Sequence, residues 1–127
     1  GSGILGITAA KLGAKSVILS DIDRQAIEAT EANVRLNKVE ELCKTVCGDL
    51  DTGEIKADIV IANITADVLL ILSKDVTRHI KSDGVMIMSG IIKSRVDEVI
   101  NAYSALGFTL EKRRDKGEWI ALVMRKV

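Results

Sequence analysis

The sequence predicts an α/β domain with a doubly wound, mostly parallel sheet and an antiparallel hairpin at its C-terminal end. Short β-branched runs alternate with amphipathic helical stretches, which is the pattern of strand–helix–strand units. The last two strand-like runs are separated by a short polar turn of hairpin type. With 127 residues, of which 47% are hydrophobic, the chain is long enough to bury the core of one compact domain.

Charge and hydropathy exclude several classes of protein. Eighteen Lys and Arg residues balance 18 Asp and Glu residues, so the formal net charge is zero and nothing favours a dedicated nucleic-acid or membrane-surface binder. No apolar run approaches the roughly 20 residues of a spanning helix, and no basic stretch precedes a hydrophobic one at the start. We therefore expect a soluble, cytoplasmic protein.

The first part of the chain is predicted to hold two helices and two strands. Small and apolar residues suit the first helix to packing on a sheet, and Gly13 follows it as a stop signal. Asp23 is placed to cap the second helix, which Asn37 would end. The elements expected here are a helix over 4–12, a strand over 16–20, a helix over 24–36 and a strand over 44–46.

The second part of the chain is predicted to hold four strands and two helices. An unbroken apolar run over 59–62 indicates a strand buried on both faces. Apolar residues at helical spacing follow it, and Gly107 stops the last helix. The elements expected here are strands over 59–62, 85–89, 108–113 and 119–124, and helices over 66–80 and 96–106.

Three residue types with reactive or bulky side chains are assigned structural roles. Cys43 and Cys47 fall on one face of a strand about 13 Å apart, too far for a disulfide, and are expected to be buried thiols. His79 is the single histidine, and its charged neighbours predict the polar side of a helix, so we expect no metal site and no catalytic triad. Trp119 is expected in the core, with a place facing a substrate cleft as the alternative.

Polar residues stand where the predicted parallel strands end, which is where ligands bind in open α/β sheets. A carboxylate such as Asp21 can accept hydrogen bonds from both ribose hydroxyls of a nucleotide, and it lies eighteen residues after Gly3. The first six residues match G-x-G-x-x-G, which brings backbone close to a ligand at a helix N-terminus. The later strand ends carry Gly48-Asp49-Leu50, Asn63-Ile64-Thr65-Ala66 and Ser89-Gly90. We predict that these strand ends converge on one nucleoside-type cofactor.

Five short motifs occur in a fixed order along the chain. They are Gly1-Ser2-Gly3-Ile4-Leu5, Asp21-Ile22-Asp23, Asn63-Ile64-Thr65-Ala66, Ser89-Gly90-Ile91 and Gly117-Glu118-Trp119. With them the whole chain resembles the class I, Rossmann-like methyltransferases that use S-adenosylmethionine. Within that class it is most similar to the family that methylates large-subunit ribosomal protein eleven.

The resemblance implies a protein N-methyltransferase acting on amino groups, either a lysine side chain or an N-terminal amine, of a ribosomal protein. It implies no nucleic-acid or membrane partner. Asp21 would hold the ribose, Asp49 the adenine amine, and Asn63 would lie near the methyl group as the catalytic residue. The implied cofactor-binding positions are Gly1, Ser2, Gly3, Asp21, Ile22, Asp49, Leu50 and Asn63.

The chain departs from the family pattern in three places. Arg24 replaces a proline that is common after D-I-D, and residues 81–84 replace a Pro-Gly turn. The family's strand before the glycine loop and its N-terminal substrate-recognition domain have no counterpart in residues 1–127. We therefore expect a methyltransferase catalytic domain truncated on its N-terminal side, and we expect this fragment to be inactive on its own.

Asn63 is the residue expected to act on the acceptor. An amine must lose its proton before it can attack, and a carboxamide oxygen can accept its remaining N–H bonds and aim the lone pair. The alternative is an asparagine that satisfies backbone groups at a strand-to-helix turn. Two other functions stay open, an NAD(P)-dependent Rossmann oxidoreductase and an inactive methyltransferase-like interaction module.

Overall fold

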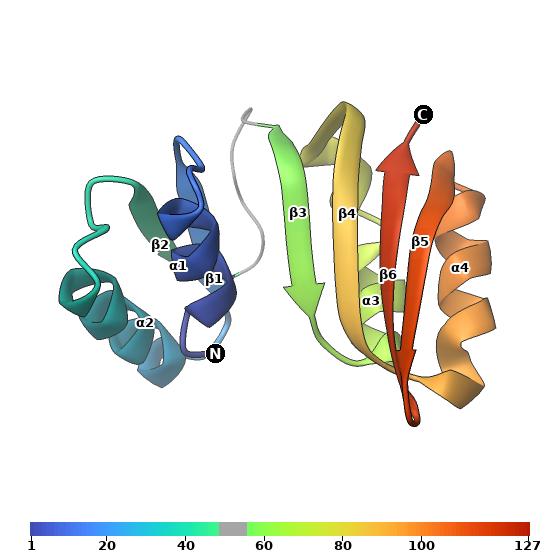
Figure 1. The fold of residues 1–127 in the computed structure, drawn as a ribbon, viewed down its shortest axis with the longest axis horizontal. Helices are drawn as coiled ribbons and strands as arrows, with labels where there is room; N and C mark the ends of the chain where they lie inside the picture. The colour runs from blue at the N-terminus through green and yellow to red at the C-terminus, as the bar shows by residue number, and fades with distance from the viewer. Residues whose placement is uncertain (49–55) are drawn as a thin grey trace. The chain divides into compact units, whose positions relative to one another are not determined.

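The computed structural model describes residues 1–48 and 56–127. The chain divides into two compact units, Gly1–Gly53 and Glu54–Val127 (Figure 1). Asp49 and Leu50, two of the predicted cofactor-binding residues, lie outside the described residues. Each unit is described below by itself.

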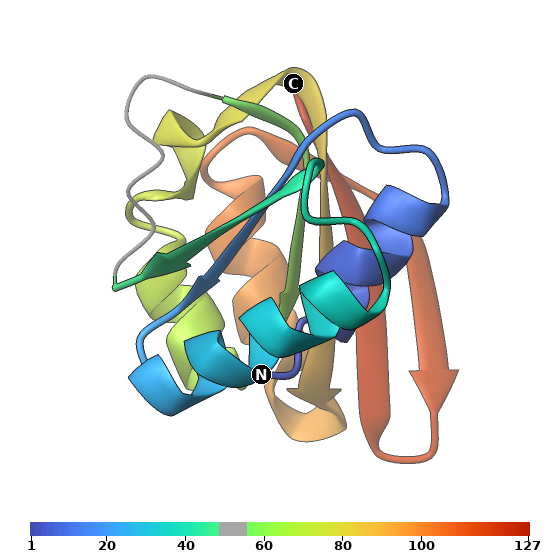
Figure 2. The ribbon, with the colours of Figure 1, turned by 90° about the vertical axis from the view of Figure 1, so that its left-hand side faces the viewer.

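The first unit is a two-stranded parallel sheet with two helices beside it (Figure 2). Strand β1 pairs with β2 so that Val17 lies opposite Cys43 and Asp21 opposite Cys47. Its elements are α1 (Ile4–Lys11), β1 (Val17–Asp21), α2 (Arg24–Leu36) and β2 (Cys43–Cys47). One buried cluster joins both helices to the sheet and contains Ile7, Ala10, Val34 and Val39, with Val17, Leu19 and Cys43 packed against it.

The sequence prediction for this unit is largely confirmed. Helix α2 has the predicted bounds, and the Asp23 carboxylate caps it by accepting the backbone N–H of Gln25 at 2.9 Å. The prediction of two buried thiols is wrong for Cys47, which is exposed, whereas Cys43 is half-buried. Cys43 packs against the buried cluster and Cys47 lies beyond it at the other end of β2. Both cysteines are free.

The second unit is a four-stranded mixed sheet in the order β3-β4-β6-β5. Strands β3 and β4 are parallel, and β6 runs antiparallel to both of its neighbours, β4 and β5. Its elements are β3 (Ala57–Asn63), α3 (Ala66–Leu72), η1 (Val76–Arg78), β4 (Ile80–Ile92), η2 (Lys93–Arg95), α4 (Val96–Ser104), β5 (Phe108–Lys116) and β6 (Trp119–Lys126). The parallel strands and the C-terminal hairpin confirm the predicted fold class.

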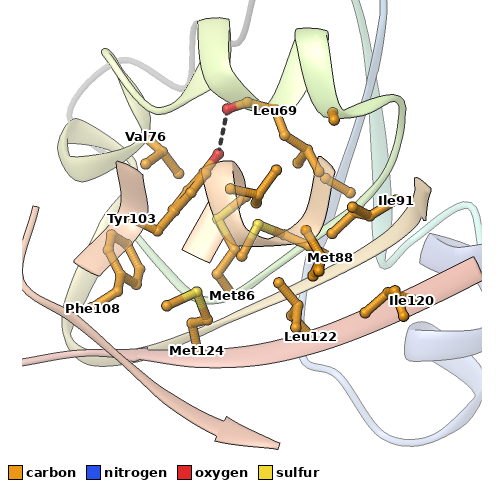
Figure 3. Close-up of a cluster of buried hydrophobic side chains, with 14 of the residues drawn as sticks. Leu69, Val76, Met86, Met88, Ile91, Tyr103, Phe108, Ile120, Leu122 and Met124 are labelled. Atoms are coloured by element: carbon orange, nitrogen blue, oxygen red, sulfur yellow. Dashed lines mark hydrogen bonds between the residues drawn. The ribbon is translucent and has the colours of Figure 1, made fainter. Parts of the chain in front are cut away.

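The core of the second unit lies between its sheet and the helices α3 and α4 (Figure 3). Tyr103 is fully buried there, and its hydroxyl donates to the backbone oxygen of Leu69 at 2.7 Å. Its ring meets Phe108 edge-on, with the centroids 5.5 Å apart. The fully buried side chains around it are Val76, Met86, Met88, Ile91, Leu122 and Met124, with Ile120 1% exposed. This core ties α3 and α4 to the strands that carry the site.

The predicted helix over residues 66–80 is wrong in its second half. Helix α3 ends at Leu72, and the Ser73 hydroxyl donates to the backbone oxygen of Leu70 at 2.6 Å in the turn that follows. Val76 and Ile80 still enter the core, from a 3₁₀ turn and from the first residue of β4. The spacing of these core residues is therefore that of one continuous helix, although the helix ends at Leu72. His79 is buried rather than on the polar side of a helix.

Two predictions of burial are also wrong. Ile59 of β3 is 57% exposed, because it alternates with Val60 and Ala62, which contact the core, and so lies on the opposite face of the strand. Trp119 is 59% exposed rather than part of the core. It is the first residue of β6, and the next residue, Ile120, takes the buried position. The exposed tryptophan lies next to the site described below.

Candidate functional site

The glycine loop at the start of α1 is held by two side chains of α2. Thr30 donates from its hydroxyl to the backbone oxygen of Gly1 at 3.0 Å, and Asn33 donates from its amide to that of Ser2 at 2.9 Å. A Cβ at Gly3 would lie 2.8 Å from a methyl carbon of Thr30, and the Gly3 φ of 85° also favours glycine. The loop thus lies close against α2 and leads directly into the first turn of α1.

Thr30 is a site residue that sequence reasoning missed. It lies on the inner face of α2 and is buried. A buried threonine one turn before Asn33 was the available signal, because a buried hydroxyl needs a hydrogen-bond partner. That partner is the glycine loop.

Asp21 lies at the end of β1 against this loop. Its carboxylate accepts the backbone N–H of Asp23 at 3.0 Å. An aspartate carboxyl group is ordinarily ionised at pH 7. The structure therefore brings together an ionised acceptor, a glycine loop and a helix N-terminus, with the exposed side chain of Ile22 next to them. Such a set can hold a diol and a carboxylate of one ligand.

Asn63 lies at the end of β3, in register with Ser89 of the parallel strand β4. The backbone N–H of Ile64 donates to the backbone oxygen of Ser89 at 3.2 Å, which joins the end of β3 to β4. Strand β4 continues past the predicted end at Ser89 to Ile92, so Gly90 lies within the strand. A Cβ at Gly90 would lie 2.6 Å from the Asn63 amide oxygen, and the Gly90 φ is 81°. Gly90 is therefore the residue that makes room for the Asn63 side chain.

A pocket of about 210 Å³ opens beside this turn. Ile92 and Trp119 are cross-strand neighbours and form its exposed apolar wall. Asp67 and Arg95 form a charged wall and bond to each other at 2.9 Å. The residues that line the pocket are Thr65, Ala66, Asp67, Gly90, Ile92, Arg95 and Trp119. An aliphatic chain with a polar end fits such a lining.

A larger hollow of about 430 Å³ lies between α1 and α2 in the first unit. It reaches from Ser2 and Ile4 to Lys11 and Leu12 at the far end of α1. Asp21 does not line it. Because it follows the flank of α1 rather than the strand ends, we do not assign the chemistry to it.

Within residues 1–48 and 56–127, no group of three or more His, Cys, Asp or Glu side chains could hold a metal ion. No helix in the described parts of the chain is long and apolar enough to cross a membrane.

The predicted site residues thus form two described clusters. Gly1, Gly3, Asp21 and Ile22 gather in the first unit, and Asn63 joins Ser89 and Gly90 in the second. The convergence of the two clusters on one cofactor stays a prediction. Asp67 and Arg95 were not singled out from the sequence, because Arg95 is 28 residues from its partner.

Comparison with known proteins gives a consistent result. A family model described as ribosomal protein L11 methyltransferase (PrmA) matches residues 1–127. The chain is 40% identical over 128 residues to the ribosomal protein L11 methyltransferase of Listeria monocytogenes, covering 99% of the chain and 41% of that protein. It is 42% identical over 127 residues to the protein of the same name from Streptococcus pneumoniae, covering 99% and 40%. The chain thus spans about two fifths of the length of these relatives.

Solved structures agree with the family match. The ribosomal protein L11 methylase of Lactobacillus delbrueckii subsp. bulgaricus superposes with a TM-score of 0.93 at 36% identity, over 100% of this chain and 67% of that one. The M. jannaschii tRNA m1G37 methyltransferase superposes with a TM-score of 0.77 at 21% identity, over 96% of this chain and 40% of that one. The second likeness shows the fold alone.

Proposed function

The chain belongs to the ribosomal protein L11 methyltransferase family, and from this membership we propose that it is the catalytic part of an enzyme that methylates amino groups of a ribosomal protein with S-adenosylmethionine. The acceptor would be a lysine side chain or an N-terminal amine. The names of the relatives support a ribosomal protein as substrate. We place the reaction in the cytoplasm and assign no nucleic-acid or membrane partner to it.

The residues of the first unit fit this cofactor. Gly3 lets the loop lie close against Thr30 of α2, and α1 can present the backbone N–H groups of its uncapped first turn to a carboxylate. The Asp21 carboxylate can accept hydrogen bonds from both ribose hydroxyls. When bound, the cofactor supplies an electrophilic methyl group on a sulfonium. Asp49 and Leu50 would complete this part of the site at the adenine.

The observation that carries the proposal is the placement of the Asn63 amide over Gly90, beside a pocket with an apolar wall. Asn63 has an acceptor oxygen at this strand end, and nearby backbone carbonyls can add to it. These oxygens would accept the N–H groups of an amine and leave its lone pair directed at the methyl group. Asn63 would therefore orient the nucleophile and not act as a base.

The amine must be neutral to react, since an ammonium has no lone pair. An exposed lysine, with a pKa near 10.4, is almost entirely protonated at pH 7. The exposed faces of Ile92 and Trp119 can desolvate an amine that enters the pocket, which lowers its pKa. The proton would pass to water before transfer, so the site needs no strong base.

The test uses the full-length protein that carries this chain, S-adenosylmethionine with a labelled methyl group, and unmodified ribosomal proteins. We expect label in one ribosomal protein, and mass spectrometry should locate it on a lysine or on the N-terminal amine. Label in RNA, or on a glutamine or carboxyl group, would contradict the acceptor class. Cofactor binding without transfer to any ribosomal protein would instead favour the inactive interaction module.

A further inference from the structure

We propose that Arg95 is a positioning residue for the turn over residues 63–66, which we call the Asn63 turn. Its side chain links the first turn of α3 to the first turn of α4 and so holds the Asn63 turn in the conformation that orients the acceptor. The inference rests on the proposed function, because its consequence for turnover assumes that Asn63 orients the acceptor. Arg95 itself need not touch the substrate. It acts through Asp67, four residues after Asn63.

The guanidinium of Arg95 bridges two acidic side chains from different helices. Its Nη2 donates to Oδ1 of Asp67 at 2.9 Å. Its Nε donates to Oε1 of Glu98 at 2.6 Å, with a second bond from Nη2 to Oε2 at 3.3 Å. Asp67 belongs to the first turn of α3 and Glu98 to the first turn of α4. One side chain therefore links two helix starts that lie 28 residues or more apart in the sequence.

The start of α3 is anchored in the core by Ala66 and Leu69, but its polar groups have few described side-chain partners. Its N-cap residue, Thr65, makes no side-chain cap hydrogen bond, and the helix is only seven residues long. An uncapped first turn leaves backbone N–H groups without intrahelical partners and frays readily. Between β3 and α3, the backbone bond from Ile64 to Ser89 holds one point of the turn at 3.2 Å. The side-chain bond from Arg95 to Asp67 holds the C-terminal side of this turn, at the start of α3.

The arginine is the least exposed member of the link. Its side chain is 33% exposed, against 75% for Asp67 and 55% for Glu98, whereas the Arg78 side chain in an ordinary surface pair is 72% exposed. The two-bond contact with Glu98 fixes the plane of the guanidinium, so the third bond is directed at Asp67. The bonds to Glu98 and Asp67 also raise the pKa of Arg95 above its ordinary value.

Arg95 and Asp67 also line the pocket next to the Asn63 turn, together with Thr65 and Ala66 of that turn. Without the bond between Arg95 and Asp67, the charged wall of the pocket would no longer be fixed, and the Asn63 turn could move relative to Gly90. Misplacement of a reactive geometry by about 1 Å can cost a factor of up to about 100 in rate. For a loosened turn we expect a smaller loss, about tenfold in turnover. Cofactor affinity should change less than about twofold, because the ribose and glycine-loop contacts are assigned to other residues.

The experiment compares Arg95→Met, Arg95→Lys, Asp67→Asn and Glu98→Gln in the full-length protein. We expect Arg95→Met to lower kcat about tenfold and Asp67→Asn to lower it less, because the asparagine amide oxygen can still accept a bond from Arg95. The double variant should lower kcat no further than Arg95→Met, because that variant already removes the link. Arg95→Lys should recover part of the loss, since lysine can reach one carboxylate but not both. Glu98→Gln should fall between the wild type and Arg95→Met. Arg78→Met, which removes the surface pair with Asp75, is the matched control and should leave kcat unchanged.

A second measurement does not depend on activity. Amide hydrogen exchange of residues 64–67 should be faster in Arg95→Met and Asp67→Asn than in the wild type and in Arg78→Met. Unchanged exchange and unchanged kcat in an active enzyme would overturn the proposal. A loss of kcat that follows the melting temperature across all variants would also overturn it, because the role would then be structural only. A wild type that transfers no methyl group would refute the proposed function, while the exchange result would still decide the link.

Discussion

Replacing Gly90 with alanine tests whether the missing Cβ of Gly90 makes room for the Asn63 side chain. The new Cβ would lie 2.6 Å from the Asn63 amide oxygen and 3.2 Å from the backbone oxygen of Ile64. The first of these contacts is closer than two such atoms can approach, so the Asn63 side chain must move. The second requires a backbone shift of a few tenths of an ångström.

The expected cost has two parts. The φ of 81° at Gly90 is left-handed, and alanine there costs about 1–2 kcal/mol in unfolding free energy. Displacement of Asn63 adds less to stability, because a side chain can rotate away, but it removes the orientation of the acceptor. We expect turnover to fall by a factor of about 10 to 100, with cofactor affinity nearly unchanged.

Gly117→Ala is the matched control. Gly117 also has a positive φ, 60°, but no heavy atom of the described residues lies within 4 Å of a Cβ built there. It should therefore show the backbone cost alone. Urea unfolding measures the stability of both variants, calorimetry measures cofactor affinity, and methyl transfer measures turnover. If the two variants lose the same activity, Asn63 is not positioned by Gly90 as we describe.

Three further predictions concern single side chains. Asn63→Ala should lower turnover well beyond its effect on cofactor affinity, and equal losses in both would reduce Asn63 to a cofactor contact. Asp21→Ala should weaken cofactor binding by about 1.5–3 kcal/mol, the range for a hydrogen bond to a charged group, and calorimetry that shows unchanged affinity would refute the ribose assignment. Tyr103→Phe should destabilise the fold by about 0.5–1.5 kcal/mol, because one buried hydrogen bond is lost while the Leu69 carbonyl keeps the Ser73 backbone N–H. Burial raises the pKa of Tyr103 above 10.0, so its contribution is full below pH 10 and declines as the pH rises further; the wild type should lose more stability than Tyr103→Phe in alkaline urea titrations.

The fold class could be predicted because each signal is local. The Asp23 cap and the apolar spacing of α2 lie within one helix, and they gave its bounds as observed. The hairpin of β5 and β6 was likewise visible in its turn residues. Where local spacing was ambiguous, the prediction was wrong. Val76 and Ile80 fit a helical stripe, yet they enter the core from a 3₁₀ turn and a strand.

Residues of the candidate site could be predicted where a single side chain has the chemistry that the ligand requires. Asp21 and Asn63 stand at the ends of β1 and β3, and such strand ends can be read from the sequence. The contacts that hold them could not be read, because they join distant segments. Thr30 contacts Gly1 across 29 residues, and Arg95 contacts Asp67 across 28. Such pairs depend on how helices pack, which no local pattern encodes.

A crystal structure of the full-length protein with S-adenosylhomocysteine would test the account most directly. We predict that the carboxylate of Asp21 lies about 3 Å from both ribose hydroxyls, and that Asn63 lies beside the sulfur of the same ligand molecule. A nucleoside bound elsewhere, or one that contacts Asp21 while Asn63 faces away from its sulfur, would contradict the account.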